Sequence, residues 1–118
     1  MNEFPISTFD LDIAIYRYFD HLVQDFRNWR ARSGCTTEWD AERIQEYSSA
    51  LTTNRGRNYL KVVSERAVHS FIVIKETKGF QIGDILKAAS WAAPATNFAR
   101  GNIFKGDYKD RVTWTVIV

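Results

Sequence analysis

The sequence has little cysteine, proline and glycine, and it lacks long apolar runs. One cysteine, Cys35, among 118 residues cannot form an internal disulfide, which excludes a disulfide scaffold and suits a reducing compartment. Two prolines and six glycines exclude a collagen-like chain. No uncharged run approaches the roughly 18–20 residues of a membrane span, and the opening MNEFPISTFDLD does not resemble a secretory signal. We therefore expect one soluble, cytoplasmic domain over residues 1–118 with no membrane partner.

Motifs for catalysis and metal binding are also missing. The chain has neither a Gly-x-x-x-x-Gly-Lys phosphate loop nor a Gly-x-Gly-x-x-Gly turn. One cysteine and two histidines, His21 and His69, do not reach the paired ligand spacing of a zinc site. Four acids lie close together in the sequence: Glu38, Asp40, Glu42 and Glu46. The first three are explained by the positive N-terminal end of a helix, where acidic side chains are favourable. We therefore predict no enzymatic activity, no metal and no cofactor, and we expect His69 to be structural.

The N-terminal half has the period of amphipathic helices. Between residues 8 and 32 apolar side chains recur at three- and four-residue steps: Ile15, Phe19, Leu22, Val23, Phe26 and Trp29. Ser7 and Asp10 resemble a capping box, and Gly34 is a C-terminal stop signal. A second helix is expected over residues 37–53, with Thr37 as N-cap. Its narrow apolar stripe contains Ile44, Tyr47 and Leu51.

The C-terminal half has the pattern of β-strands. After a polar turn at residues 55–58, strands are expected over residues 59–65 and 68–75, and a third within 80–87. The last strand, 111–118, alternates apolar and polar positions, which places Trp114 in the core. The central strand is apolar on both faces, which places Phe71 in the core as well. The predicted fold is α+β: a helical layer (1–54) packed on a β layer (55–118). That layer is a bent antiparallel sheet or a partly open small β-barrel of four to five strands.

Charge is distributed unevenly between the two halves. Residues 1–50 carry five basic and nine acidic residues, a net charge of −4, whereas residues 51–118 carry eleven basic and five acidic residues, a net charge of +6. Such a division is typical of a basic face for nucleic acid. It is equally expected when two oppositely charged layers pack on each other.

The segment of residues 88–104, AASWAAPATNFARGNIF, combines small residues with aromatic rings. Exposed rings can stack on bases, and Arg100 can contact a phosphate. The alternative is that Trp91 and Phe98 cover the open end of the sheet as core residues. If the chain binds nucleic acid, ten residues are the predicted contacts: Arg55, Arg57, Lys61, Lys87, Trp91, Phe98, Arg100, Lys105, Lys109 and Arg111.

The run from Gly83 to Phe104, preceded by VHSFIV at residues 68–73, resembles small uncharacterised proteins of tailed bacteriophages. The resemblance covers about residues 58–118 and carries no activity. It implies a phage origin, a location in the host cytoplasm and a host factor as partner. We predict a non-catalytic protein-interaction module, whose first helix or sheet edge docks on a host protein or on itself as a homodimer. The alternative is a nucleic-acid-binding module that uses the basic C-terminal sheet and the Trp91–Arg100 loop.

Overall fold

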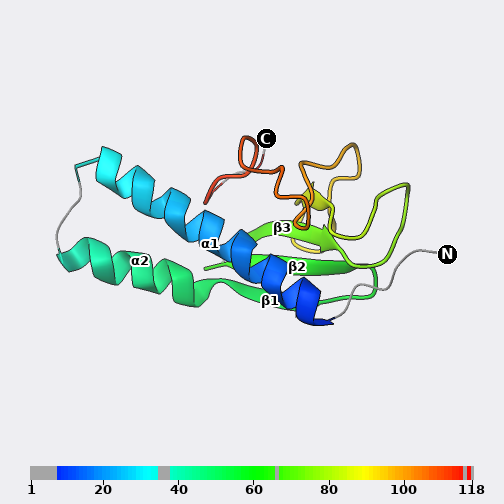
Figure 1. The fold of residues 1–118 in the computed structure, drawn as a ribbon, viewed down its shortest axis with the longest axis horizontal. Helices are drawn as coiled ribbons and strands as arrows, with labels where there is room; N and C mark the ends of the chain where they lie inside the picture. Colours follow the sequence, from blue (N-terminus) through cyan, green and yellow to red (C-terminus); the bar gives the residue numbers. More distant parts are fainter. Residues whose placement is uncertain (1–7, 35–37, 66, 116, 118) are drawn as a thin grey trace.

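Two helices precede a four-stranded antiparallel sheet in a computed structural model, which describes residues 8–34, 38–65, 67–115 and 117 (Figure 1). The elements are α1 (Thr8–Arg32), α2 (Glu38–Ala50), β1 (Thr52–Arg55), β2 (Tyr59–Ser64), β3 (Ala67–Val73) and β4 (Ile85–Lys87). The strands lie in the order β1-β2-β3-β4, and every pair is antiparallel. The predicted α+β fold, with two helices before an antiparallel sheet, is confirmed, and the sheet is open.

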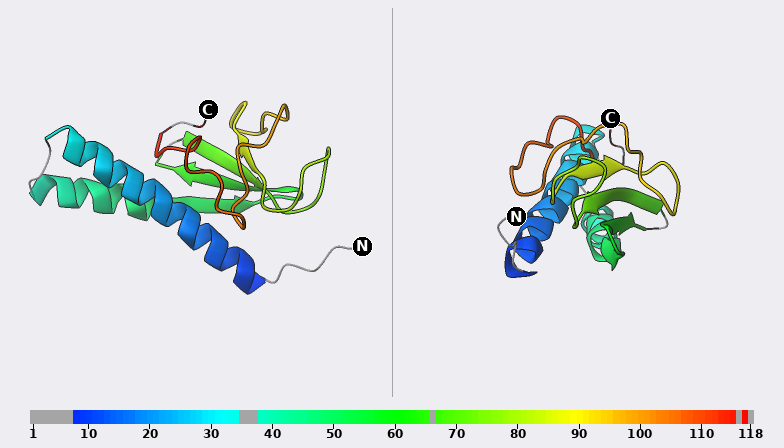
Figure 2. Two further views of the ribbon diagram at one scale, coloured as in Figure 1. Left: turned by 45° about the horizontal axis from the view of Figure 1, so that its top comes forward. Right: turned by 90° about the vertical axis from the view of Figure 1, so that its right-hand side faces the viewer.

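Helix α1 crosses one face of the sheet and continues past its end beside α2 (Figures 1 and 2). Its most buried positions follow a four-residue step: Ala14, Tyr18, Leu22 and Phe26. This stripe lies beside the predicted one, so aromatic side chains outside it remain exposed, among them Phe9, Tyr16 and Trp29. Gly34, with a φ of 81°, ends the helix as expected. The predicted caps Ser7 and Thr37, and Cys35, lie outside the described residues.

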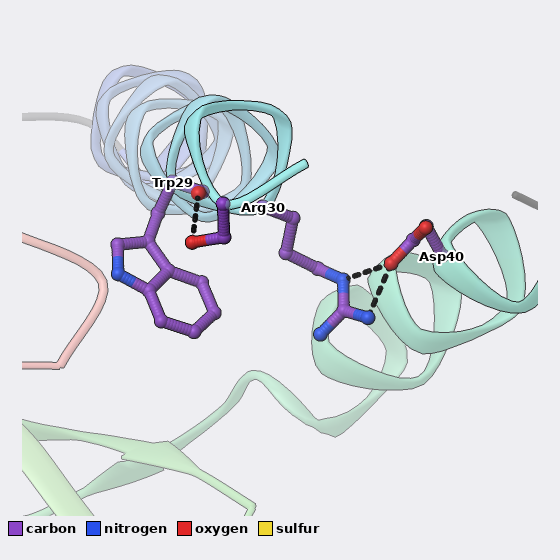
Figure 3. A network of polar contacts seen from close by, with 4 residues as sticks. Trp29, Arg30 and Asp40 are labelled. Atoms are coloured by element: carbon purple, nitrogen blue, oxygen red, sulfur yellow. Dashed lines mark hydrogen bonds and ion pairs between the residues drawn. The ribbon is translucent and has the colours of Figure 1, made fainter. Parts of the chain in front are cut away.

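Helix α2 is fixed to α1 by an ion pair near the helix connection. The Nε of Arg30 donates to the Oδ1 of Asp40 at 2.6 Å, and its Nη2 contacts the same oxygen (Figure 3). Asp40 is buried, so this acid serves the helix pair. The helix ends at Ala50, before the predicted residue 53, because Thr52 already pairs with Val63 in the sheet. The polar turn at 55–58 is therefore the turn of a β-hairpin.

The sheet has two different faces. The inner face, under α1, contributes Leu60, Val62, Ile72 and Ile85 to the main core. The outer face carries a second cluster, which we call the outer cluster: Phe71, Val73 and Leu86, with Tyr59, Val68, Phe80, Ala88 and Ala99 packed against it. Phe71 is buried, as predicted. The strand expected within 80–87 is shorter, because turns occupy the residues before Asp84.

The predicted strand at 111–118 is wrong for the part of it that the structure describes. Turns occupy residues 103–111, and Val112 forms an isolated antiparallel bridge with Ile117 instead of joining the four-stranded sheet. Hydrogen bonds from side chains take the place of the backbone hydrogen bonds expected between strands. The carbonyl oxygens of Val112, Thr113 and Trp114 accept hydrogen bonds from His21, His69 and Tyr47 at 2.8, 2.7 and 2.9 Å. Val116 and Val118 lie outside the described residues.

Trp114 joins the helical layer rather than the sheet. Its ring is half-buried and lies 4.4, 5.3 and 5.7 Å from the ring centroids of Phe26, Trp29 and Tyr47. Its backbone nitrogen donates to Asp25 at 3.0 Å. Trp114 therefore packs against the core, as predicted, but at its border and from a non-strand segment.

Candidate functional site

Residues 88–104 follow β4 and are held against it by backbone hydrogen bonds. After a turn at residues 89–93, Ala95 donates to the carbonyl of Lys87, Arg100 donates to that of Ile85, and Ile85 donates to that of Gly101. The bonds are interrupted between residues 95 and 100, so the segment is an irregular neighbour of β4. Its turn near residue 90 lies on the side of the sheet away from α1 (Figure 2). This attachment positions two aromatic rings near the outer cluster.

The first ring is that of Trp91, which is 57% exposed. The ammonium group of Lys61 lies 4.7 Å from its centroid and 5.9 Å from that of Phe71. Lys61 and Phe71 are paired positions of β2 and β3, which places the Lys61–Trp91 contact over the outer face of the sheet. A cation over an aromatic face is a favourable arrangement. The sequence pattern singled out both residues but could not show that they touch.

The second ring is that of Phe98, which is 44% exposed and has two arginines near it. The guanidinium carbon of Arg100 lies 3.9 Å from the Phe98 centroid, and that of Arg111 lies 5.5 Å from it. Arg100 also donates from Nη1 to the Oδ1 of Asn97 at 2.9 Å and to the carbonyl of Phe98 at 2.8 Å. We call these two groups of contacts the basic–aromatic surface. It consists of Lys61 with Trp91, and of Phe98 with Arg100 and Arg111.

Asn102 holds the loop that carries these groups. Its side chain donates to the carbonyl of Ile82 and to Asp84, each at 3.0 Å, and accepts from the nitrogen of Phe104 at 2.9 Å. Its own backbone nitrogen donates to Asp107 at 2.8 Å. Asn102 is buried, and nothing in the sequence pattern marked it. Asp84 also accepts from the backbone nitrogen of Gln81 at 2.8 Å, so this acid helps to hold the loop.

A hollow of about 290 Å³ lies beside Arg100. Three cations line it, Arg100, Lys105 and Arg111, together with the two acids Asp84 and Asp107. Burial, and secondarily the charge of Arg111, lowers the pKa of the Arg100 guanidinium from its ordinary value. The groups around this hollow can bind an anion by charge and hydrogen bonding.

The other predicted contacts are distributed more widely. Arg55 and Arg57 are exposed at β1 and its turn, and β1 is the sheet edge opposite β4. Lys87 is exposed at the end of β4. Lys109 is exposed and lines a different hollow, between α1 and the turns after Asn102. The structure thus gathers Arg100, Lys105 and Arg111 around one hollow, with Phe98 near the two arginines, and pairs Lys61 with Trp91.

Two further hollows follow α1 on the opposite side of the sheet from the outer cluster. Their volumes are about 550 and 490 Å³, and four residues line both: Arg17, Ile103, Phe104 and Lys105. Phe104 is 37% exposed, and Tyr16, which lines the second hollow, is 75% exposed. Together they form a mixed apolar and basic groove along the helix.

Among residues 8–34, 38–65, 67–115 and 117, no three histidine, cysteine, aspartate or glutamate side chains form a group able to hold a metal ion. Neither of the helices so described is long and apolar enough to cross a membrane.

Comparison with known proteins supplies a family. A model of a family of unknown function, DUF7717, matches residues 8–116. The chain belongs to this family. The prediction of an uncharacterised family is therefore confirmed, while no finding links it to tailed bacteriophages. No curated protein and no solved structure matches the chain. The family description indicates no catalytic activity.

Proposed function

We propose that this protein is a non-catalytic module that binds single-stranded nucleic acid at the basic–aromatic surface. The observation that carries the proposal is the exposure of Trp91 and Phe98, each accompanied by a cation at 4.7 or 3.9 Å. Proteins that bind single strands combine aromatic rings, on which bases stack, with cations that follow the phosphates. Exposure of 57% and 44% favours this role over the alternative of rings that cover the core.

The position of the acidic residues supports the same proposal. Eight of the nine acids of residues 1–50 belong to α1 and α2. Helix α1 packs on the inner face of the sheet, whereas Lys61 and Trp91 lie over the outer face. The acids of α1 are therefore separated from the Lys61–Trp91 pair by the sheet, which reduces their repulsion of a bound phosphate.

The test is fluorescence anisotropy with labelled single- and double-stranded oligonucleotides at about 50 mM salt, where phosphate contacts are strong. We expect binding of the single strand, weakened by ~1–3 kcal/mol in Trp91→Ala or Phe98→Ala, because each loses a stacking ring. Tyr16→Ala is the matched control, since it removes an exposed ring from α1. Absence of binding at tens of micromolar protein would remove the proposal.

A protein-interaction module is the second candidate, favoured by the groove along α1 and by Tyr16 beside it. Exposed aromatic residues around an apolar groove are typical of interfaces. The occupant we propose for this candidate is a second copy of the chain; a host protein is proposed on the phage resemblance alone. Light scattering at high micromolar concentration should give about twice 13.7 kDa. Tyr16→Ser should lower this mass and Trp91→Ser should not; a monomer in the unaltered protein contradicts the dimer.

A further inference from the structure

Arg100 is a buried cation whose hydrogen bonding is incomplete. The residue is 5% exposed, and its Nη1 makes the hydrogen bonds to Asn97 and Phe98. A guanidinium has five N–H groups. The Nε of Arg100 is buried without a hydrogen-bond partner in the structure, and its Nη2 donates to no residue of the described ranges. Burial of the Nε donor is unfavourable unless a partner is supplied, whereas Nη2 retains access to solvent and can donate to a ligand.

Arg100 also differs from the partly buried arginines of the helical layer. Arg30 pairs with Asp40 and Arg43 pairs with Glu65. Arg100 has no carboxylate within ion-pair distance among the residues that the structure describes, and the charge that acts most on it is that of Arg111. Arg100 and Arg111 both lie near the Phe98 ring, and neither forms an ion pair with the residues that the structure describes. An anion bound beside them would offset the repulsion between their charges.

The hollow beside Arg100 provides the space for that anion. Arg111 and Lys105 line it with exposed side chains, so an anion there meets three cations. The two acids in the lining are already engaged: Asp84 accepts from Gln81 and Asn102, and Asp107 accepts from the nitrogen of Asn102. Their charges weaken the attraction but leave a net positive site.

We propose that this hollow is a binding site for a single phosphate group, held by Arg100, Arg111 and Lys105. Arginine presents planar N–H donors that match phosphate oxygens in pairs, and phosphate carries enough negative charge to engage all three cations. The proposal rests on the proposed function for its source of phosphate, a phosphodiester of the bound strand. A free phosphate or a phosphate monoester has the same chemistry and is the other source to be distinguished.

The experiment is an NMR titration of the full chain that follows the side-chain Nε–H signal of Arg100. Inorganic phosphate is added at constant ionic strength, with chloride as the reference anion. We expect a saturable shift with phosphate and none with chloride. Arg100→Lys should weaken phosphate binding about tenfold or more, because it removes the charged hydrogen bonds of the guanidinium. A linear response, equal for both anions, would overturn the proposal.

Because Arg100→Lys disturbs a buried site, exposed variants keep the test independent of folding. Arg111→Gln should weaken phosphate binding about two- to fivefold, as removal of an exposed charge does. Arg57→Gln removes the same charge at the opposite sheet edge and should have no effect. Asp107→Asn, which retains the acceptor for Asn102, should tighten binding. Equal effects of Arg111→Gln and Arg57→Gln would contradict a local site.

Oligothymidine without terminal phosphates distinguishes the sources. A shift of the Arg100 signal by this strand assigns the site to the phosphodiester. A shift by inorganic phosphate, with no binding of the strand, keeps the phosphate site and removes the nucleic-acid function. Binding of the strand, with no shift at Arg100 by either the strand or inorganic phosphate, keeps the proposed function and overturns the phosphate site.

Discussion

At the level of single residues, the buried surroundings of His69 favour a neutral imidazole, and its hydrogen bonds fit that form. Its Nε2 donates to the carbonyl of Thr113 at 2.7 Å, because a carbonyl oxygen can only accept. Nδ1 then accepts from the hydroxyl of Ser70 at 3.1 Å, and Ser70 accepts from Tyr18 at 2.8 Å. A second proton on the ring would turn Nδ1 into a donor, so the Ser70 hydroxyl could no longer donate to it and would accept from it instead. The buried Ser70 and His69 side chains therefore form a structural network, as expected for His69.

Acid should consequently destabilise the protein through His69. Burial, with the charge of His21 as a smaller cause, lowers the pKa of His69 below its ordinary value of 6.5. The unfolded chain then binds the proton first, so stability is full above pH 6.5 and falls as the pH decreases toward the lowered value. The loss is at most about 1.4 kcal/mol per pH unit. Urea unfolding at several pH values should show it, and His69→Gln should lack it. Identical pH slopes would contradict this assignment.

Gly101 is a second residue whose role depends on its surroundings. Its φ is 140°, and a Cβ placed there would lie 2.7 Å from the Cβ and 2.8 Å from the Cα of Tyr108. Gly101→Ala should therefore destabilise the protein by more than ~2 kcal/mol, since backbone strain and overpacking add. Gly79, with a φ of 83° and open space around it, is the control and should lose only ~1 kcal/mol as Ala. Thermal unfolding of both variants provides the comparison; equal losses would contradict the steric argument.

At the level of elements, the C-terminal segment joins the two layers of the molecule. Tyr47 of α2 and Asp25 of α1 bind the backbone of Trp114, and His69 of β3 binds that of Thr113. Alternating apolar residues predicted a strand here, but the same residues bury their side chains without a strand. Polar side chains from three elements satisfy the backbone groups that a sheet would otherwise pair.

Removal of the Trp114 ring should separate this segment from the helices. We expect Trp114→Ala to lower the free energy of unfolding by about 3 kcal/mol, the lower end of the range for buried aromatic residues, because the ring is half-buried. Trp91→Ala removes an equally large ring that is 57% exposed and should cost less than about 1 kcal/mol. Denaturant unfolding measures both. An unchanged midpoint for Trp114→Ala would contradict its assignment to the core border.

At the level of the whole molecule, the distribution of charge predicts strongly salt-dependent binding. Each phosphate neutralised on a single strand contributes about −0.7 to the slope of log affinity against log salt. Arg111→Gln should therefore flatten the slope by less than one unit, whereas Trp91→Ala should reduce affinity without changing the slope. Anisotropy titrations at several salt concentrations test this. A slope unchanged in Arg111→Gln would place the phosphates elsewhere on the molecule.

The sequence alone determined the elements whose residues interact locally. The period of residues 8–32 predicted α1, the glycine at 34 predicted its end, and the doubly apolar run around Phe71 predicted the central strand. These patterns are readable because neighbours three, four or two positions apart share a face. The composition of residues 88–104 likewise marked Trp91, Phe98 and Arg100 as candidate contacts.

Only the tertiary structure decided where those residues lie and what surrounds them. The contact of Lys61 with Trp91 joins positions thirty residues apart. The position of Arg100 beside the hollow, where no described residue forms an ion pair with it, depends on how the loop around Asn102 folds. The segment that contains Val112, Thr113 and Trp114 is not part of the four-stranded sheet, because side chains of α1, α2 and β3 donate to its carbonyl groups. Such long-range contacts have no local period, so no pattern along the chain could have predicted them.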